Sequence, residues 1–295
     1  MSKHIIAISW NHVQTPIDFR DKLVLSQKEI QQCVHLLIDN NEIIEIVALS
    51  TCNRIEFYAF AKQSIDIVVI IKNIYTEILK RDIPWSKSEP EIYVGMEAVQ
   101  HICRVASGIE SMVFGEMQIL SQVKAAHQAL IQSQPDADVL NKLFSIAVHC
   151  AEAVRNDSHF SKCSTSISEL AVQVAQQIFL HLEQKTILIV GAGKMADITA
   201  CYFKKAKVNK IIIANRSERP GKALAKSIAA DYINLHQLND IIHECDAIVT
   251  VTHAREYLIE RKHIENIMNN RKRSLLLLDI STPRNINPSS NEIDN

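Results

Sequence analysis

The chain has 295 residues, of which 47% are hydrophobic and 22% are charged, and its formal net charge is −1. This length suits about two domains with a core each, and the balanced charge gives no electrostatic footprint for nucleic acid. No apolar stretch approaches the ~20 residues of a membrane span, and the N-terminus leads into a strand-like run without a signal peptide. Seven scattered cysteines without a C-x-x-C pair indicate a reducing compartment, free thiols and no structural zinc. We therefore expect a cytoplasmic protein without a metal site.

The first 158 residues are predicted to form a small α+β domain. The spacing of apolar residues predicts a strand at 4–9, a helix at 27–40, two strands at 43–49 and 55–60, and a helix at 64–80. The second strand of the central pair alternates in the manner of a half-buried strand. The stretches around residues 11–21 and 81–90 are predicted to be loops. From Gly95 to Ser158 the pattern is helical, and Gly108 is expected to end the first of these helices.

A polar pentapeptide interrupts the two central strands at Ser50-Thr51-Cys52-Asn53-Arg54. Arg54 is expected to lower the pKa of the Cys52 thiol and so favour the thiolate, which is the nucleophilic form. Cys52 is also compatible with a small buried hydrophobe. On these residues alone both interpretations stay open.

Residues 109–123 combine many apolar side chains with a few polar ones, and the only charges among them are Glu110 and Glu116. Gln118 and Gln122 are four residues apart and share one face of the predicted helix. Amides in apolar surroundings need hydrogen-bond partners. They either bond to neighbouring helices or line a polar substrate pocket, and the pattern does not distinguish the two.

A second domain is predicted over residues 186–288, after a linker and connecting helix at 159–185. A buried strand at 186–190 runs directly into Gly191-Ala192-Gly193-Lys194-Met195-Ala196 and then a helix. This is G-x-G-x-x-A in the strand–turn–helix context that a dinucleotide-binding fingerprint requires. The first glycine permits the tight turn, the second lets the backbone approach the pyrophosphate, and the small Ala196 allows close helix packing.

The next predicted strand ends in Asn215-Arg216-Ser217. A site that prefers NAD usually places Asp or Glu here, whereas an arginine beside a hydroxyl suits the 2′-phosphate of NADP. A surface arginine after a strand is the alternative. Further strands at 232–233, 247–251 and 275–280 complete a Rossmann-type doubly wound parallel sheet, with His253 as a loop residue and a disordered tail at 289–295. The fold class is therefore α/β, with an N-terminal α+β catalytic domain before the Rossmann domain.

Taken together, these motifs resemble those of the glutamyl-tRNA reductase family, in order from residue 5 to about residue 288. The matching stretches are Ser50-Thr51-Cys52-Asn53-Arg54, Val99-Gln100-His101 through Gly108, Ser111-Met112-Val113, Gly115-Glu116 with Gln118-Ile119, Gln122-Val123-Lys124, Gly191-Ala192-Gly193, Ala214-Asn215-Arg216, and Asp279-Ile280 with Pro283-Arg284. The opening loop keeps Asn11-His12 but departs from the family pattern after these two residues.

The resemblance implies that Cys52 is the nucleophile that forms a thioester and that His101 assists proton movement near the thiol or the leaving group. It also implies a substrate pocket in which Arg54 binds the side-chain carboxylate of the glutamyl group and Glu116 its α-ammonium group. The implied pocket comprises Thr51, Asn53, Arg54, Ser111, Glu116, Met117, Gln118 and Gln122. The implied NADPH site comprises Gly191, Ala192, Gly193, Lys194, Met195, Ala196, Asn215, Arg216 and Ser217.

The implied activity is the NADPH-dependent reduction of glutamyl-tRNA(Glu) to glutamate-1-semialdehyde, the first committed step of 5-aminolevulinate and porphyrin biosynthesis. The downstream aminomutase is a further implied partner. Family members normally continue into a helical dimerisation domain, so we do not expect the usual homodimer for this chain. The alternative is a catalytically weakened homologue that binds tRNA or a partner. A dehydrogenase of small carbonyl compounds is less favoured, because it gives Cys52, Gln118 and Gln122 no role.

Overall fold

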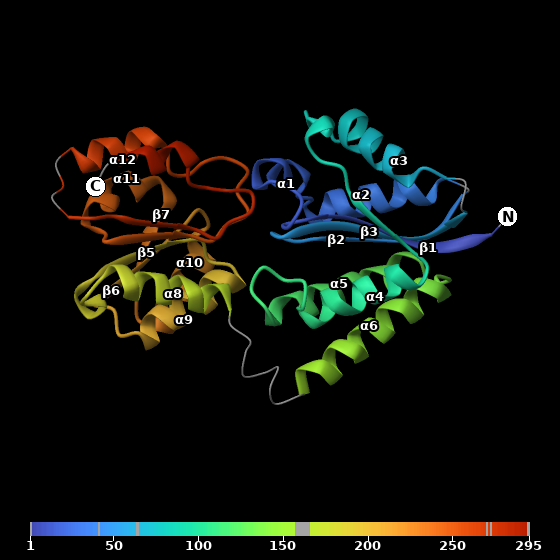
Figure 1. Cartoon of the computed structure of the whole chain (residues 1–295). Coiled ribbons are helices and arrows are strands. Elements are labelled where there is room, and N and C mark those ends of the chain that lie inside the picture. The colour runs from blue at the N-terminus through green and yellow to red at the C-terminus, as the bar shows by residue number, and fades with distance from the viewer. Residues whose placement is uncertain are drawn as a thin grey trace. The chain divides into compact units, whose positions relative to one another are not determined.

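The computed structural model describes residues 2–40, 42–62, 65–156, 166–269, 271 and 273–293. The chain divides into two compact units, Met1–Thr165 and Ser166–Asn295 (Figure 1). None of the helices in these residues is long and apolar enough to cross a membrane.

The first unit is built on a four-stranded antiparallel sheet with the strand order β2-β3-β1-β4. Its strands are β1 (Lys3–Asn11), β2 (Ile43–Ser50), β3 (Arg54–Lys62) and β4 (Glu91–Val94). The register of β1 and β3 sets Asn11 opposite Arg54. The turn between β2 and β3 therefore lies at the same edge of the sheet as the end of β1.

Helices cover both faces of this sheet (Figure 1). One face carries α1 (Ile17–Leu23), α2 (Gln27–Ile38) and α3 (Ile67–Asn73), which continues into the π-helical turn η1 (Ile74–Ile78). The other face carries α4 (Met96–Ser107), α5 (Met117–Ser133) and α6 (Asp138–Asn156). A short 3-10 turn, η2 (Trp85–Lys87), precedes β4. The sheet thus lies between two apolar cores.

This arrangement corrects the expectation of a half-buried strand after Cys52. Ile55 and Phe57 of β3 pack into one core, while Tyr58 packs into the other. Glu56, which the alternation assigns to solvent, is fully buried. A charged residue in such a strand needs partners inside the protein.

Three further segments differ from the sequence-based expectation. The polar loop expected at residues 11–21 contains the start of α1, which begins directly after Pro16, because Phe19 and Leu23 bury one helical face. The short edge strand β4 follows a predicted loop and pairs with β1. Gly108 ends α4 with φ of 81°, as predicted, but the helical pattern does not resume until α5, because a loop at 108–116 follows in which Gly115 has φ of 76°.

The second unit contains a five-stranded parallel sheet, as predicted, with the strand order β7-β6-β5-β8-β9. Its strands are β5 (Thr186–Val190), β6 (Lys210–Asn215), β7 (Asp231–Asn234), β8 (Ala247–Thr250) and β9 (Leu276–Asp279). Counted within the unit, this is the order 3-2-1-4-5 of a doubly wound dinucleotide-binding sheet. The reversal of strand order between β5 and β8 marks the ligand-binding crevice.

Helices again lie on both faces of this sheet (Figure 1). One face carries α8 (Ile167–Ile178), α9 (Lys194–Lys205) and α10 (Glu218–Ile228), and the other carries α11 (Leu238–Ile241) and α12 (Arg261–Met268). Short 3-10 turns are η3 (Leu182–Gln184), η4 (Leu235–Gln237), η5 (Ile242–Glu244) and η6 (Pro288–Glu292).

The end of the second unit differs from the disordered tail expected for residues 289–295. The turn η6 is ordered, Ser290 is 6% exposed, and Ile293 packs against the core of that face. Its Asn287 cap, which accepts a hydrogen bond from the Ser289 amide, explains why this polar segment folds. Residues 294 and 295 lie outside the described chain.

Candidate active site

Cys52 lies in the tight turn between β2 and β3, which Thr51 holds closed. The Thr51 amide donates to the Arg54 carbonyl at 2.9 Å. The Thr51 hydroxyl accepts from the amides of Asn53 at 3.2 Å and Arg54 at 3.1 Å. Thr51, predicted to contact substrate, therefore uses its side chain to fix the turn that presents Cys52.

The protein surroundings disfavour ionisation of Cys52. Burial of the thiol and the nearby carboxylate of Glu116 raise its pKa to about 11, while the guanidinium groups of Arg20 and Arg54 act in the opposite direction. The expected effect of Arg54 on the thiol thus has the predicted sign but is outweighed. At neutral pH the free protein holds Cys52 as the thiol.

Arg54 is itself neutralised by acidic partners. Its side chain is 1% exposed, Nη1 lies 2.8 Å from Oε1 of Glu56, and Nη2 donates to the carbonyl of Glu110. Glu56 also accepts from Ser9 Oγ at 2.8 Å and from Tyr58 OH at 2.6 Å. Burial alone would raise the pKa of Glu56, but Arg54 and the hydrogen bonds hold it well below its usual range. Glu56 is therefore a permanent carboxylate beneath the turn.

His101 joins this buried network on α4. Its Nε2 lies 3.0 Å from Oε1 of Glu56, and its Nδ1 lies 3.1 Å from Oε2 of Glu110. Burial alone would lower the pKa of His101, but Glu110 and Glu56 outweigh it and raise the pKa to about 9. The ring also stacks on Tyr93 with centroids 4.2 Å apart. We call Arg54, Glu56, His101 and Glu110 the buried ion network.

The position of His101 bears on the role expected for it. An imidazolium with a carboxylate on each nitrogen has no lone pair with which to accept a proton. Among the described residues, no hydrogen bond or ion pair joins His101 to Cys52. The geometry therefore supports a structural role for His101 and gives no support to proton transfer at the thiol.

Sequence reasoning missed Glu56 and Tyr58, although a signal was present. Arg54, Glu56 and Tyr58 alternate along β3, and a period of two places them on one face of the sheet. Their partners Glu110 and His101 come from loop and helix segments far along the chain, so the alternation alone could not reveal them.

Glu116 is 7% exposed and occupies the N-cap position of α5. Burial raises the pKa of its carboxyl group, against the opposing charges of Arg54 and Arg155. Arg155 Nη2 donates to the Glu116 carbonyl at 2.8 Å and so anchors the loop. Gln118 and Gln122 follow on α5 and are both partly exposed. The side chain of Met117 lies outside the described atoms.

A cavity of about 280 Å³ lies at the edge of the sheet beside the turn. Of the predicted substrate residues it gathers only Arg54 and Ser111. The lining residues are Asn11, His12, Val13, Arg54, Glu91, Tyr93, Ile109, Glu110 and Ser111. Cys52, Thr51, Asn53, Glu116, Gln118 and Gln122 are not among them. A neighbouring cavity of about 460 Å³ is lined in part by His101.

His12 is another lining residue that the sequence did not single out for the site. Burial and the charges of Arg54 and Arg20 lower its pKa below the ordinary value, although Glu110 acts against them. His12 is therefore a neutral imidazole at neutral pH, in contrast to His101.

In the second unit, the turn after β5 has the geometry that a dinucleotide requires. Gly191 has φ of +125°, and a Cβ there would lie 2.2 Å from the Val251 carbonyl oxygen. Gly193 is the N-cap residue of α9, and a Cβ there would meet none of the described atoms within 4 Å, so the space beside this turn is open. Ala196 is fully buried against the core. These residues fit a pyrophosphate at the start of α9.

The residues after β6 form an ordered turn with an exposed cation. Asn215 Nδ2 donates to the Ser217 carbonyl at 2.8 Å, and the Tyr232 hydroxyl donates to the Asn215 carbonyl at 3.3 Å. Arg216 between them is exposed, and no acidic side chain in the described chain pairs with it. Its guanidinium is thus available to an anionic group at the carboxyl edge of the sheet.

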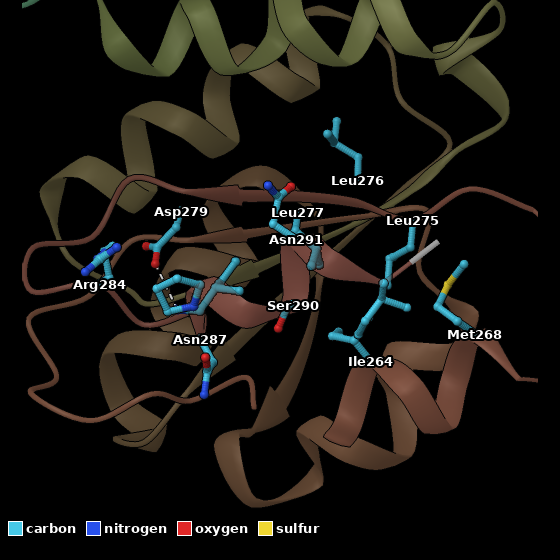
Figure 2. A pocket seen from close by; sticks show the side chains of 13 residues that line it. Ile264, Met268, Leu275, Leu276, Leu277, Asp279, Arg284, Asn287, Ser290 and Asn291 are labelled. Carbon is cyan, nitrogen blue, oxygen red and sulfur yellow. Dashed lines mark hydrogen bonds between the residues drawn. The ribbon is translucent and has the colours of Figure 1, made fainter. Parts of the chain in front are cut away.

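The same unit contains a hollow of about 480 Å³ beside β9, between α12 and η6 (Figure 2). Ile264, Met268 and Leu275 lie together at one end of it, and Asp279 and Arg284 lie at the other (Figure 2). None of the predicted cofactor residues lines it. His253 is exposed in the loop after β8, as expected.

A thiol-presenting α+β unit followed by a dinucleotide-binding unit defines an oxidoreductase of the dehydrogenase type. Residues 8–158 match the family profile "Glutamyl-tRNAGlu reductase, N-terminal domain", and residues 173–295 match "Shikimate / quinate 5-dehydrogenase". The chain belongs to the glutamyl-tRNA reductase family, which confirms the resemblance seen in its sequence.

Individual relatives agree with this assignment. The glutamyl-tRNA reductase of Macrococcus caseolyticus is 35% identical over 99% of this chain and 66% of its own length. That of Trichlorobacter lovleyi is 31% identical over 99% of this chain and 67% of its own length. The solved glutamyl-tRNA reductase of Methanopyrus kandleri has the same fold, with a TM-score of 0.51 and 24% identity over 98% of this chain and 69% of that one. The chain thus spans about two thirds of the length of these relatives.

Proposed function

We propose that this protein catalyses the NADPH-dependent reduction of glutamyl-tRNA(Glu) to glutamate-1-semialdehyde through a thioester on Cys52. This reaction would be the first committed step of 5-aminolevulinate and porphyrin biosynthesis. The observation that carries the proposal is the presentation of Cys52 at a rigid turn in a chain whose other unit has an open dinucleotide-binding turn. A thiol-dependent reduction needs both features, because the thiol forms the covalent intermediate and the dinucleotide supplies the hydride.

The chemistry divides into two steps. The Cys52 thiolate attacks the carbonyl carbon of the aminoacyl ester, a carbon–sulfur bond forms, and the ester oxygen leaves with the tRNA and takes up a proton. NADPH, when bound, supplies the hydride that converts this thioester into the aldehyde. Cys52 then leaves as thiolate and recovers its proton.

Glu116 links substrate binding to activation of the thiol. Its carboxylate contributes to the raised pKa of Cys52. An α-ammonium group bound at Glu116 would cancel that negative charge, so the pKa of the thiol would fall when the substrate arrives. The nucleophile would then form only with a glutamyl group in place.

Arg54 and Ser111 line one cavity, which we propose receives the side-chain carboxylate of the glutamyl group. Glu56 holds Arg54 at 2.8 Å, whereas Glu110 is 3.9 Å away and more exposed. A ligand carboxylate would therefore replace the contact with Glu110 while Glu56 stays in place.

We assign NADPH to the turn Gly191–Ala196 and the segment Asn215–Ser217. The clash that any Cβ at Gly191 would make and the open space at Gly193 support a pyrophosphate there. The unpaired exposed charge of Arg216 supports a 2′-phosphate. The aminomutase that consumes the semialdehyde remains a proposed partner.

The thioester is testable without any cofactor. Wild type incubated with glutamyl-tRNA carrying radiolabelled glutamate, then quenched in acid, should retain label on the peptide that contains Cys52. Cys52→Ser should retain background label only, because the hydroxyl is a far weaker nucleophile. Cys201→Ser, which removes an exposed thiol in the other unit, is the matched control and should label like wild type. Unlabelled wild type that still binds glutamyl-tRNA would refute the proposal.

A catalytically weakened homologue that binds tRNA or a partner is the second candidate. The raised pKa of Cys52, about 11, favours it, because little thiolate is present at neutral pH. The labelling experiment separates the two functions, since this candidate binds glutamyl-tRNA without acquiring the glutamyl group.

A further inference from the structure

Arg20 is a buried cation beside the turn that carries Cys52. It lies on α1, is 4% exposed, and donates through Nη1 to the carbonyl of Asn53 at 3.1 Å. Its Nε is buried, and none of the described residues forms a hydrogen bond with it. Within the described chain no carboxylate forms an ion pair with it, so its charge is not neutralised by a direct contact.

Arg54, the arginine that the family motif highlights, differs in this respect. Its charge is balanced by Glu56 at 2.8 Å and by Glu110 at 3.9 Å. A guanidinium that already pairs with carboxylates attracts a further anion less strongly than an unpaired one at similar depth. Of the two cations, Arg20 is therefore better placed to stabilise a negative charge that develops at the turn.

We infer that Arg20 is a positioning residue that fixes the Cys52 turn through the Asn53 carbonyl and stabilises the Cys52 thiolate by its unpaired charge. A buried guanidinium left without an anion is costly, and a thiolate at the adjacent turn would lower that cost. The role in catalysis rests on the proposed function, whereas the effect on the thiol does not.

The surrounding charges are consistent with this assignment. The Cys52 thiol experiences Glu116 as an opposing charge and Arg20 and Arg54 as favourable ones. Burial lowers the pKa of Arg20, ionised Cys52 and Asp21 raise it, and Arg54 lowers it. His12, another titratable neighbour of Arg20, is neutral at neutral pH because burial and the two arginines lower its pKa against the opposing charge of Glu110.

Alkylation of Cys52 by iodoacetamide tests the inference on the full chain without substrate. The thiolate attacks the methylene carbon, a carbon–sulfur bond forms and iodide leaves, so the rate below the pKa follows the thiolate fraction. Mass spectrometry of the Cys52 peptide between pH 7.5 and 10 gives this rate, with exposed Cys201 as the internal reference. Arg20→Gln should slow the alkylation of Cys52 about three- to tenfold at each pH. A rise of about one unit in the pKa of the thiol lowers the thiolate fraction, and the greater nucleophilicity of the more basic thiolate offsets part of this loss. Arg20→Lys, which keeps the charge, should remain within about threefold of wild type.

Arg81→Gln is the matched structural control. Arg81 donates to the carbonyls of Lys22 and Val24 at the end of α1, and it is not among the charges that act on Cys52. In the Arg81→Gln variant, Cys52 should be alkylated at the wild-type rate.

If Arg20→Gln melts below the assay temperature, Arg20→Met serves as the neutral variant. A folded neutral variant with the wild-type rate would overturn the inference. So would equal slowing in Arg20→Lys or in Arg81→Gln, which would trace the effect to packing of α1. Because no glutamyl-tRNA is used, failure here is distinct from failure of the proposed function.

Discussion

Glu116 is the negative charge that most opposes ionisation of Cys52. After burial, it is the largest contribution to the raised thiol pKa of about 11. The same carboxylate is nearly buried at the start of α5, so solvent screens it little. At the residue scale, the reactivity of Cys52 is therefore set by the balance between Glu116 and the arginines around the turn.

Replacing Glu116 with glutamine should make Cys52 more reactive in the free protein. Removal of the negative charge lowers the thiol pKa, and we expect alkylation at pH 8 to accelerate about three- to tenfold. Glu97→Gln, at an exposed position on α4, is the control and should leave the rate unchanged. If Glu116→Gln alkylates no faster than wild type, then Glu116 does not control the ionisation of Cys52.

The sequence identified Cys52, Arg54 and Glu116 as site residues but could not assign the state of their charges. Arg54 was interpreted as a cation available to the substrate, although Glu56 on the same strand and Glu110, 56 residues away in a loop, both pair with it. Arg20 looked like part of a polar loop because α1 spans only seven residues and has a weak periodic signal. The nearest partner of Arg54, Glu56, is only two residues away and was readable from the alternation along β3, whereas the contacts with Glu110 and of Arg20 with the Asn53 carbonyl are long-range in the chain.

At the element scale, the buried ion network ties β3 to α4 and to the loop before α5. Glu56 on β3 and Glu110 in the loop both hold His101 of α4, at 3.0 and 3.1 Å. Arg54 adds a second cation, and Arg104, which is largely exposed, lies 2.8 Å from Oε1 of the partly exposed Glu110, so two carboxylates hold three positive groups. Such a network holds its elements in one arrangement, and the loss of one charge leaves another unpaired.

The network predicts that the first unit loses stability at alkaline pH. The pKa of His101 is raised from 6.5 to about 9, so its contribution is complete below pH 6.5 and is lost as pH rises through 9. The loss should reach about 3 kcal/mol of unfolding free energy. Urea unfolding followed by tryptophan fluorescence reports on this unit alone, because both tryptophans, Trp10 and Trp85, lie in it.

His101→Gln is the control for this pH dependence. The variant is expected to be less stable than wild type at pH 6.5, because Glu56 and Glu110 lose a cation. Its unfolding free energy should then change little between pH 6.5 and 9.5. A wild type whose stability is the same at both pH values, or a variant that shows the full alkaline loss, would contradict a charged His101.

Element types were predictable where the apolar period was long or the turn chemistry specific. The helix at 27–40 and the strand–turn–helix at 186–205 follow from periodicity and from Gly191. The end of α4 at Gly108 was predicted, but the edge strand β4 and the loop that continues to residue 116 were not. β4 has only four residues, and the loop depends on Gly108, where a Cβ would lie 3.2 Å from backbone atoms of Glu116. That close approach is tertiary and leaves no local pattern.

At the scale of the whole molecule, each unit holds one half of the proposed reaction. The first presents a thiol at a rigid turn, and the second presents an open helix N-terminus and the exposed charge of Arg216. Acyl transfer and hydride transfer are therefore assigned to different units of one chain. This division means that the two steps can be uncoupled by substitution in one unit at a time.

Discharge of the acylated protein by NADPH is the sharpest test of this division. Wild type loaded on Cys52 from labelled glutamyl-tRNA should release labelled glutamate-1-semialdehyde in a single turnover when NADPH is added. The Arg216→Glu variant, changed at an exposed position, should acquire the glutamyl group on Cys52 to the same extent as wild type. It should release the aldehyde at least about tenfold more slowly at limiting NADPH, because an attractive contact to the 2′-phosphate becomes repulsive. Cys52→Ser should yield neither thioester nor aldehyde. Loaded wild type that keeps its label in the presence of NADPH, or that releases only glutamate, would contradict the proposed two-step reaction.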